Sequence, residues 1–208
     1  MISQPRYLPC ISYLRRIEYV DTFIILDNVQ RVERGFENRN KLLDMNSNQQ
    51  WLTIPVKSSS RCLIKDAEIN GEEWIEEHRR KVSNWYPKHP DIDEVFYEYT
   101  ERFKRKSLSY RDGLVDSLEY ISNFYGIGTE FVLASNISAT INGGVDELIR
   151  LTKLVGGDTY VSGKTCLSYG LDHDYATEKG VNLEIDEVNG IEYGFIDSLY
   201  MDGVNLNL

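Results

Sequence analysis

The stretch that decides the fold is a short apolar run near the start of the chain, Tyr19-Val20-Asp21-Thr22-Phe23-Ile24-Ile25-Leu26-Asp27. A continuous apolar run of this length is typical of a strand that is buried on both faces of a parallel sheet. The residues just before it recur at helical spacing, at Ile11, Leu14, Ile17 and Val20. The chain is therefore predicted to start with a strand end, a loop, a helix and a buried strand.

In the last third of the chain, short apolar runs typical of strands alternate with stretches whose apolar residues recur at helical spacing. This pattern predicts strands at Glu130–Ala134, Asp158–Val161 and Val181–Ile185, and helices at 145–155 and Leu171–Glu178. This β-α-β-α-β order favours a parallel sheet with crossover helices. We expect an α/β fold with a Rossmann-like three-layer sheet, parallel or mixed.

The middle third is predicted to be helical, with helices at Glu72–Tyr86, Asp91–Lys104 and Tyr110–Tyr125. The residues before it predict a strand at Trp51–Val56 and a short one at Ile64–Ile69. We expect a single domain over residues 1–208, in which residues 72–125 form a helical insertion.

Composition excludes several classes of protein. Apolar residues make up 41% and charged residues 27% of the 208, which is typical of globular rather than disordered chains. No apolar run approaches the length of a membrane span, no signal peptide is visible, and we expect no membrane partner. Three scattered cysteines favour neither a disulfide framework nor a metal site, so the expected compartment is the cytoplasm.

The net charge of −10 makes nucleic acid a poor partner, although it does not exclude one. The basic residues nevertheless gather locally, at Arg31, Arg34, Arg39, Lys41, Lys57, Arg61 and Lys65. A local cationic site on an acidic protein suits a small anionic or nucleotide-linked substrate. The alternative is a solvated basic loop.

Three polar segments follow predicted strands, where open α/β sheets bind their ligands. The first holds Gln4, Tyr7 and Tyr13, with Pro5 and Pro9 stiffening the loop. Such a loop presents side chains at fixed positions for reading a ligand. Its alternative role is that of a rigid connector with a half-buried tyrosine.

The second segment begins at Asp27, whose carboxylate is costly at the end of a buried strand unless it has a partner. Asp27 is a candidate general base or ribose ligand. Arg34 and Arg39 can make bidentate bonds to phosphate, and amides can orient a substrate. The amide candidates are Gln30, Asn38 and Asn40. An internal salt-bridge network that holds a hairpin is the alternative.

The third segment is Ser162-Gly163-Lys164, followed by Tyr169. Backbone N–H groups of such a turn can bind an anion, although the spacing is not that of a P-loop. A plain turn is the alternative. His78 is a candidate for proton transfer, but its place in an apolar stripe also fits a packed core histidine. Cys10 is interpreted as structural.

Together these segments resemble the WbqC family, which is associated with gene clusters for O-antigen and other surface polysaccharides. The resemblance rests on four blocks: Gln4-Pro5 with Tyr7, Pro9 and Tyr13; Asp27 to Asn40; Trp51 to Lys57; and Ser162-Gly163 with Tyr169. Trp74 and His78 also fall where the family has a tryptophan and often a histidine. The chain departs from the family pattern at Ser12, Thr165 and Cys166, and Asn28 replaces the second acid of an Asp-Asp pair.

The resemblance implies a cytoplasmic transferase that acts on a nucleotide-activated or phosphorylated small substrate. Acyl or aminoacyl transfer in surface-polysaccharide biosynthesis is the leading hypothesis. Arg34, Arg39 and Lys57 would bind the substrate with the three segments above, and Asp27 or His78 would handle a proton. The alternatives are a non-catalytic ligand-binding or scaffold subunit, and amino-acid transfer to a modified nucleic-acid base. Neither a metal nor a particular cofactor is indicated.

Overall fold

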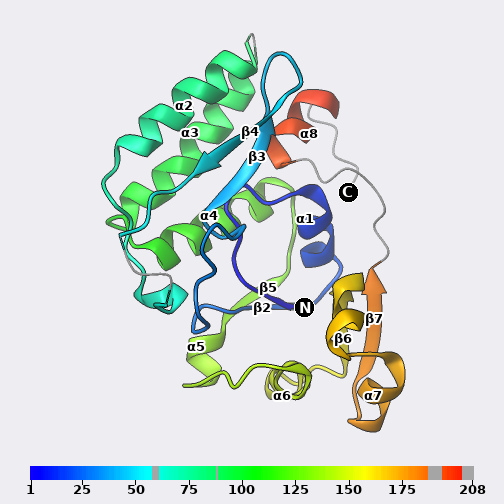
Figure 1. The fold of residues 1–208 in the computed structure, drawn as a ribbon. Helices are drawn as coiled ribbons and strands as arrows, with labels where there is room; N and C mark the ends of the chain where they lie inside the picture. Colours follow the sequence, from blue (N-terminus) through cyan, green and yellow to red (C-terminus); the bar gives the residue numbers. More distant parts are fainter. Residues whose placement is uncertain (58–60, 88, 187–193, 203–208) are drawn as a thin grey trace. The chain divides into compact units, whose positions relative to one another are not determined.

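The computed structural model describes residues 1–57, 61–87, 89–186 and 194–202. The chain has an α/β fold with small sheets and several helices (Figure 1). Contacts divide it into two compact units. The first unit comprises residues 1–4, 12–29 and the described residues from 127 to 186. The second comprises residues 5–11, 30–126 and the described residues from 194 on.

The first unit contains two parallel sheets, as the apolar runs predict. The strands β1 (Ile2–Ser3), β2 (Thr22–Ile25) and β5 (Glu130–Leu133) pair in the order β1-β2-β5. In this register Ile24 lies opposite Ile2 on one side and Val132 on the other. The strands β6 (Thr159–Gly163) and β7 (Asn182–Asp186) form the second sheet, with Tyr160 opposite Leu183.

Helices connect these strands. They are α1 (Ile11–Glu18), α5 (Ala134–Ile137), α6 (Val145–Leu154) and α7 (His173–Glu178), and a 3₁₀ helix η2 (Lys164–Tyr169) follows β6. Gly156 ends α6 in the left-handed conformation with φ +77°, which a side chain would disfavour. The core of this unit draws on both sheets and on α6, through Ile2, Ile24, Ile149, Leu151, Tyr160 and Leu183.

The second unit contains an antiparallel hairpin of β3 (Arg39–Leu43) and β4 (Gln49–Thr53), with Lys41 opposite Trp51. The strand expected at residues 51–56 therefore lies earlier. Its ladder ends before Pro55, which has no N–H to donate. Strand β3 was missed because Arg39, Asn40 and Lys41 give it a polar sequence.

The strand expected at Ile64–Ile69 is wrong in its first half. Residues Ile64–Asp66 form a 3₁₀ helix, η1. Only isolated bridges follow, between Val56 and Ile69 and between Glu68 and Ser109.

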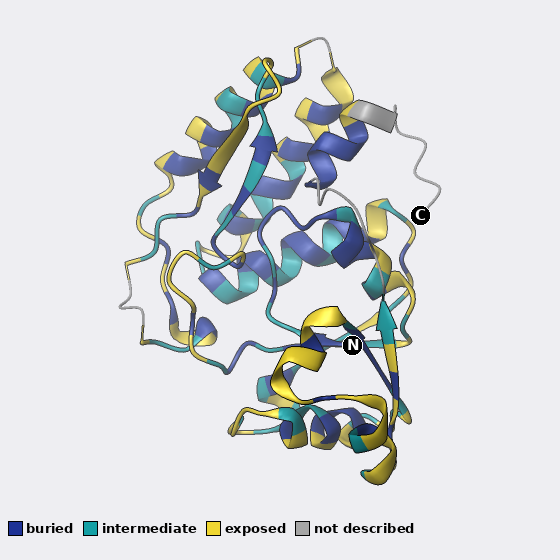
Figure 2. Cartoon of the chain, turned by 45° about the vertical axis from the view of Figure 1, so that its right-hand side comes forward, coloured by how far each residue is buried: buried dark blue, intermediate teal, exposed yellow. Residues whose placement is uncertain are grey.

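The predicted helices of the middle third are all present in the second unit, as α2 (Glu73–Trp85), α3 (Pro90–Arg105) and α4 (Tyr110–Phe124). Pro90 starts α3, and the Ser109 side chain caps α4 by accepting from the Asp112 N–H. A further helix, α8 (Phe195–Asp202), belongs to the same unit. Figure 2 shows buried and exposed residues alternating along α2 and α3, whereas the described residues of α4 and α8 are mainly buried or intermediate.

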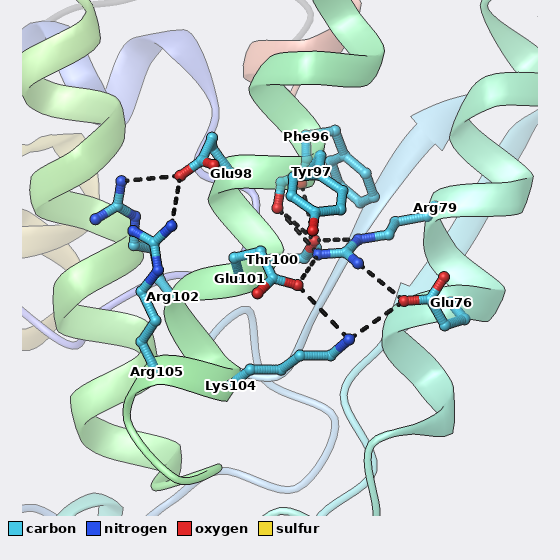
Figure 3. Close-up of polar contacts among 10 residues, drawn as sticks. All are labelled: Glu76, Arg79, Phe96, Tyr97, Glu98, Thr100, Glu101, Arg102, Lys104 and Arg105. Carbon is cyan, nitrogen blue, oxygen red and sulfur yellow. Dashed lines mark hydrogen bonds and ion pairs between the residues drawn. The ribbon is translucent and has the colours of Figure 1, made fainter.

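Arg79 of α2 ties that helix to α3 (Figure 3). Its guanidinium donates to Glu76 and Glu101 at 2.8 and 2.7 Å, and to the Thr100 hydroxyl at 2.8 Å. The same group lies over the Tyr97 ring, 4.0 Å from its centroid. A planar group with several fixed donors can satisfy all these partners at once, as a lysine could not.

None of the helices in the described part of the chain has the length and apolarity that crossing a membrane requires.

Gly113 allows α3 and α4 to approach closely. A Cβ at this position would overlap the ring of Phe103, which is fully buried. Gly113→Ala should therefore destabilise the protein by about 1–3 kcal/mol through overpacking. In an unconstrained helix, by contrast, replacing glycine with alanine increases the stability by about 1 kcal/mol.

Urea denaturation measures this free energy of unfolding. Gly128→Ala is the control, because a Cβ at Gly128 meets nothing within 4 Å. A Gly113→Ala variant as stable as the control would contradict the close packing of α3 on α4.

Candidate functional site

A buried carboxylate lies at the carboxyl end of β2 in the first unit. Asp27 Oδ1 accepts from the backbone N–H of Ser135 at 2.9 Å, and Oδ2 accepts from the Ser135 hydroxyl at 2.6 Å. Asp27 is fully buried, so these bonds offset the cost of removing the carboxylate from water. Ser135 follows β5, so the pair joins the carboxyl ends of two neighbouring strands.

The next residue, Asn28, is also buried. Its Nδ2 donates to the Ser138 carbonyl at 2.7 Å, whereas its Oδ1 has no hydrogen-bond partner among the described residues. A buried acceptor without a partner is costly, and a donor on a ligand would relieve that cost. A neutral acceptor therefore lies next to Asp27 in the sequence.

A cavity of about 280 Å³ opens at this end of the first unit. Two of its lining residues, Leu26 and Val29, flank Asp27 and Asn28. The other apolar walls come from the segment before α6 and from α6 itself, and its polar groups are few. The lining comprises Leu26, Val29, Ile141, Gly143, Gly144, Glu147, Leu148, Leu151 and Tyr169.

The cavity brings together parts of two segments that the sequence analysis singled out, because Tyr169 shares it with the residues flanking Asp27. Ser162, in contrast, is buried within β6 and lies opposite Ile185, and Gly163 lies opposite Asp186. The strand therefore extends through the position where an anion-binding turn was expected. Ser162 hydrogen-bonds the side chains of Tyr160 and Tyr169 and so helps to position the latter.

Glu147 is the charged residue of the cavity lining. Its carboxylate accepts from both Nε and Nη2 of Arg150. That ion pair, ahead of other effects, holds the pKa of Glu147 below its ordinary value. Because Arg150 neutralises this acid, the cavity presents a mainly apolar interior.

In the first segment, Tyr13 is fully buried and its hydroxyl donates to the Gln4 carbonyl at 2.8 Å. Tyr13 thus fixes the backbone directly after β1. The Gln4 side chain is half-buried. Both residues belong to the first unit.

Tyr7 and His78 meet in the core of the second unit. The Tyr7 hydroxyl lies 2.9 Å from His78 Nδ1, and both side chains are buried. The Tyr7 ring also packs on Trp74, Tyr99 and Phe103. Burial, followed by the nearby charge of Lys81, lowers the pKa of His78 to about 4. The neutral histidine therefore acts as a partner for Tyr7 within an aromatic core.

The asparagines of the second segment bind backbone in the second unit. Asn40 Nδ2 donates to the Leu8 carbonyl at 2.6 Å, which ties the hairpin to the loop after Tyr7. Asn38 Nδ2 donates to the Ile54 carbonyl at 3.3 Å, while its buried Oδ1 has no partner among the described residues. These contacts match the alternative that the segment holds a hairpin, although the bonds are amide rather than ionic.

The cationic candidates lie nearer the surface of the second unit. Arg34 and Gln30 are exposed, and Lys57 forms a long ion pair of 3.9 Å with Glu68. Arg39 Nε donates to the Arg34 carbonyl at 2.9 Å, and its guanidinium lies 4.0 Å from the centroid of the Trp51 ring.

Two residues were missed as candidates. Ser135 directly follows the strand that the sequence predicts at Glu130–Ala134, and that position alone could have identified it. Trp51 was assigned only to a strand, although an exposed tryptophan next to Arg39 and Lys41 could have been noticed once β3 was recognised. Within the described ranges, no group of three or more metal-ligating side chains is found.

The lowered pKa of His78 predicts a pH dependence of stability. An unfolded chain binds a proton at His78 near pH 6.5, whereas the folded chain binds it near pH 4. Between these values the unfolded state binds more protons, so stability falls as the pH decreases from 6.5 to 4. The loss is on the order of 3 kcal/mol. The His78→Gln variant should lack this loss of stability when its free energy of unfolding is measured by urea denaturation across this pH range.

His173→Gln, in the exposed first turn of α7, is the matched control and should keep the wild-type pH dependence. A His78→Gln variant whose free energy of unfolding keeps the full pH dependence would contradict the burial of this histidine.

Comparison with known proteins places the whole fold in context. A protein of Mycobacterium tuberculosis, Rv1507c, whose function is uncharacterized, is 27% identical over 176 residues, which cover 81% of this chain and 73% of that protein. No solved structure matches the chain. The model of the WbqC-like protein family matches residues 4–204, a span that includes both the cavity of the first unit and the hairpin of the second. This chain therefore belongs to the WbqC-like protein family.

Proposed function

We propose that the protein is a cytoplasmic transferase that moves an acyl or aminoacyl group to or from a nucleotide-activated or phosphorylated small substrate. The observation that carries this proposal is the cavity at the carboxyl end of β2. Its lining is mainly apolar, and two lining residues, Leu26 and Val29, flank in sequence the buried Asp27, which accepts from the Ser135 hydroxyl.

The cavity suits the transferred group. Its volume of about 280 Å³ is close to the lower end of the range for small-molecule sites, about 300 Å³. Its walls are largely Leu, Ile and Val side chains, which favour an acyl chain or an apolar amino-acid side chain over a phosphate. The Tyr169 hydroxyl supplies a polar group that can orient the acyl carbonyl.

Asp27 and Ser135 suit the movement of a proton. The Ser135 hydroxyl donates to Asp27, and Ser135 is only half-buried. A substrate amine or hydroxyl that replaces this donor would pass its proton to Asp27, in the manner of a general base. The unsatisfied Oδ1 of Asn28 offers the same substrate a second acceptor.

We also propose that the two parallel sheets of the first unit are halves of one doubly wound, Rossmann-like sheet in the order β5-β2-β1-β6-β7. Its support is that β1 and β6 contact each other and that both sheets share one core. In this order the strands that follow β1 extend to one side of it, through β2 and β5, whereas β6 and β7 lie on its other side. The point between β1 and β6 is therefore a topological switch point, where such sheets bind ligands, and Gln4 and Gly163 would flank it.

The chain belongs to the WbqC-like family. The biosynthetic setting is what the sequence resemblance to that family implies. A nucleotide sugar that carries an amino or hydroxyl group would then be the acceptor. The setting also supports a cytoplasmic location, where activated sugars are made.

Asp27→Asn should lower the rate of transfer by about 100-fold or more, because an amide cannot accept the proton. The measurement uses mass spectrometry of purified protein incubated with pairs of acyl or aminoacyl donors and nucleotide-sugar acceptors. The expected signal is an acceptor that gains the mass of the donor's acyl group with the wild type only.

Asp197→Asn is a matched control. Asp197 is buried in the second unit and also accepts a backbone N–H and a hydroxyl, from Leu43 at 2.9 Å and Tyr86 at 2.6 Å. Both substitutions remove one buried charge, so both should reduce stability. Equal transfer rates per folded molecule in the two variants would contradict the role of Asp27.

A non-catalytic ligand-binding subunit is the second candidate. It is favoured by the saturation of both Asp27 oxygens by Ser135, an arrangement that also serves simply to fix the start of α5. A thermal-shift screen with acyl-CoA, amino acids and nucleotide sugars separates the two. A ligand whose rising concentration progressively raises the melting temperature, without any transferred mass for any pair, would favour the binding subunit.

A further inference from the structure

The outer surface of the β3–β4 hairpin carries cations and aromatic rings in direct contact. Arg39 and Lys41 of β3 lie over the ring of Trp51 on β4, at 4.0 and 5.1 Å from its centroid. The Phe36 ring lies 6.5 Å from that of Trp51, and Arg6 lies over Phe36 at 5.5 Å. We call these five residues the hairpin face.

Both rings of the hairpin face are accessible, since 49% of Phe36 and 39% of Trp51 is exposed. Exposing large aromatic side chains side by side forgoes the gain from burying them. Their backbone is nevertheless fixed. Trp51 lies within the ladder opposite Lys41, and the Phe36 carbonyl accepts from the Tyr7 N–H at 3.0 Å. The rings therefore form a preorganised surface.

Two cations of this face, Arg39 and Lys41, form no ion pair with a carboxylate of the described residues. Arg39 donates instead to a backbone carbonyl, and Lys41 donates to the Gln49 side chain. The acid at the tip of the hairpin, Asp44, is already occupied by Asn46, Asn48 and Gln50. This contrasts with Arg79, which lies over Tyr97 at the same 4.0 Å but is held by Glu76 and Glu101 (Figure 3).

A ligand that complements this face has a flat ring and at least one strong negative charge close to it. A nucleotide has both, because its base can stack on aromatic side chains while arginine binds its phosphates. A neutral sugar would use the rings but not the cations. An acidic peptide would use the cations but leave the rings exposed.

We propose that the hairpin face binds the nucleoside diphosphate portion of the activated substrate, with the base on Trp51 and Phe36 and the phosphates on Arg39 and Lys41. This inference rests on the proposed function, whose substrate class it specifies. It assigns the nucleotide to the second unit, whereas the cavity of the first unit takes the acyl group.

The test is a calorimetric titration of the full chain with four probes: UDP, ADP, uridine and inorganic pyrophosphate. UDP and ADP should each bind saturably and at least about tenfold more tightly than uridine or pyrophosphate. Uridine offers only the base contacts, and pyrophosphate offers only the phosphate contacts. Trp51→Ala should weaken UDP binding by about tenfold or more, as for other bases stacked on aromatic residues. Trp51→Phe keeps a ring and should retain most of the affinity.

Arg39→Gln separates the phosphate contact from the base contact. It should weaken binding of UDP and pyrophosphate by about tenfold while leaving that of uridine unchanged. Tyr97→Ala is the matched control, because it removes an exposed ring under an arginine at the same distance but beside carboxylates. It should leave every affinity unchanged. Because Arg39 is not part of the core, Arg39→Gln tests the proposal even if Trp51→Ala fails to fold.

Three outcomes would overturn the inference. One is the absence of saturable binding of either diphosphate at about 10 mM, a concentration well above typical substrate levels. Another is binding that Trp51→Ala and Arg39→Gln leave unchanged. The third is a single-stranded oligonucleotide that binds about 100-fold more tightly than UDP with a steep salt dependence, which would make nucleic acid the ligand.

The proposed transferase activity can fail separately. Binding at the hairpin face without any transfer would retain the nucleotide site and reject the transferase. Transfer without binding at the hairpin face would retain the transferase and reject the nucleotide site.

Discussion

The arrangement of the first unit depends on how the charge of Asp27 is satisfied. A carboxylate at the end of a fully buried strand has no access to water, so the fold must supply donors. Ser135 supplies two of them, from its backbone and its hydroxyl. Because Ser135 follows β5, this requirement fixes where β5 ends relative to β2 and where α5 begins. This polar pair cannot separate without leaving a buried charge, and its neighbour Leu26 lines the cavity.

The two units offer complementary chemistry. The first presents a mainly apolar cavity with one neutralised acid, and the second presents two exposed rings beside Arg39 and Lys41. The proposed transfer reaction would call for both kinds of chemistry, since an acyl group and a nucleotide differ in polarity. The net charge of −10 gives no sign of the second surface, because whole-chain charge averages over a local cluster.

Much of the fold could be predicted from the sequence because periodicity is strong where one face is buried. The helices α2, α3, α4 and α6 were found in this way. Strand β3 was not, because Arg39 and Lys41 keep its outward side polar, and the sequence resembles a loop until its pairing with β4 is known. The end of β6 was placed too early for a related reason, since Ser162 and Gly163 are poor strand formers that only pairing with β7 holds in place. Tyr7 and His78 were singled out separately, for ligand binding and for proton transfer. Their contact could not be predicted, because it depends on the helix packing that joins them.

The chain alternates between the two units several times along its length, so that neither is a continuous stretch of sequence. Residues 5–11 and 30–126 of the second unit are separated by residues 12–29 of the first. No single cut can release either unit intact, and a fragment that ends after α4 would lack most of the first unit's strands. Folding must close long loops before the sheets of the first unit can pair, which is the condition that slows folding and exposes strand edges during synthesis. Expression of fragments is therefore a poor route to this protein, whereas the intact chain can be studied one substitution at a time.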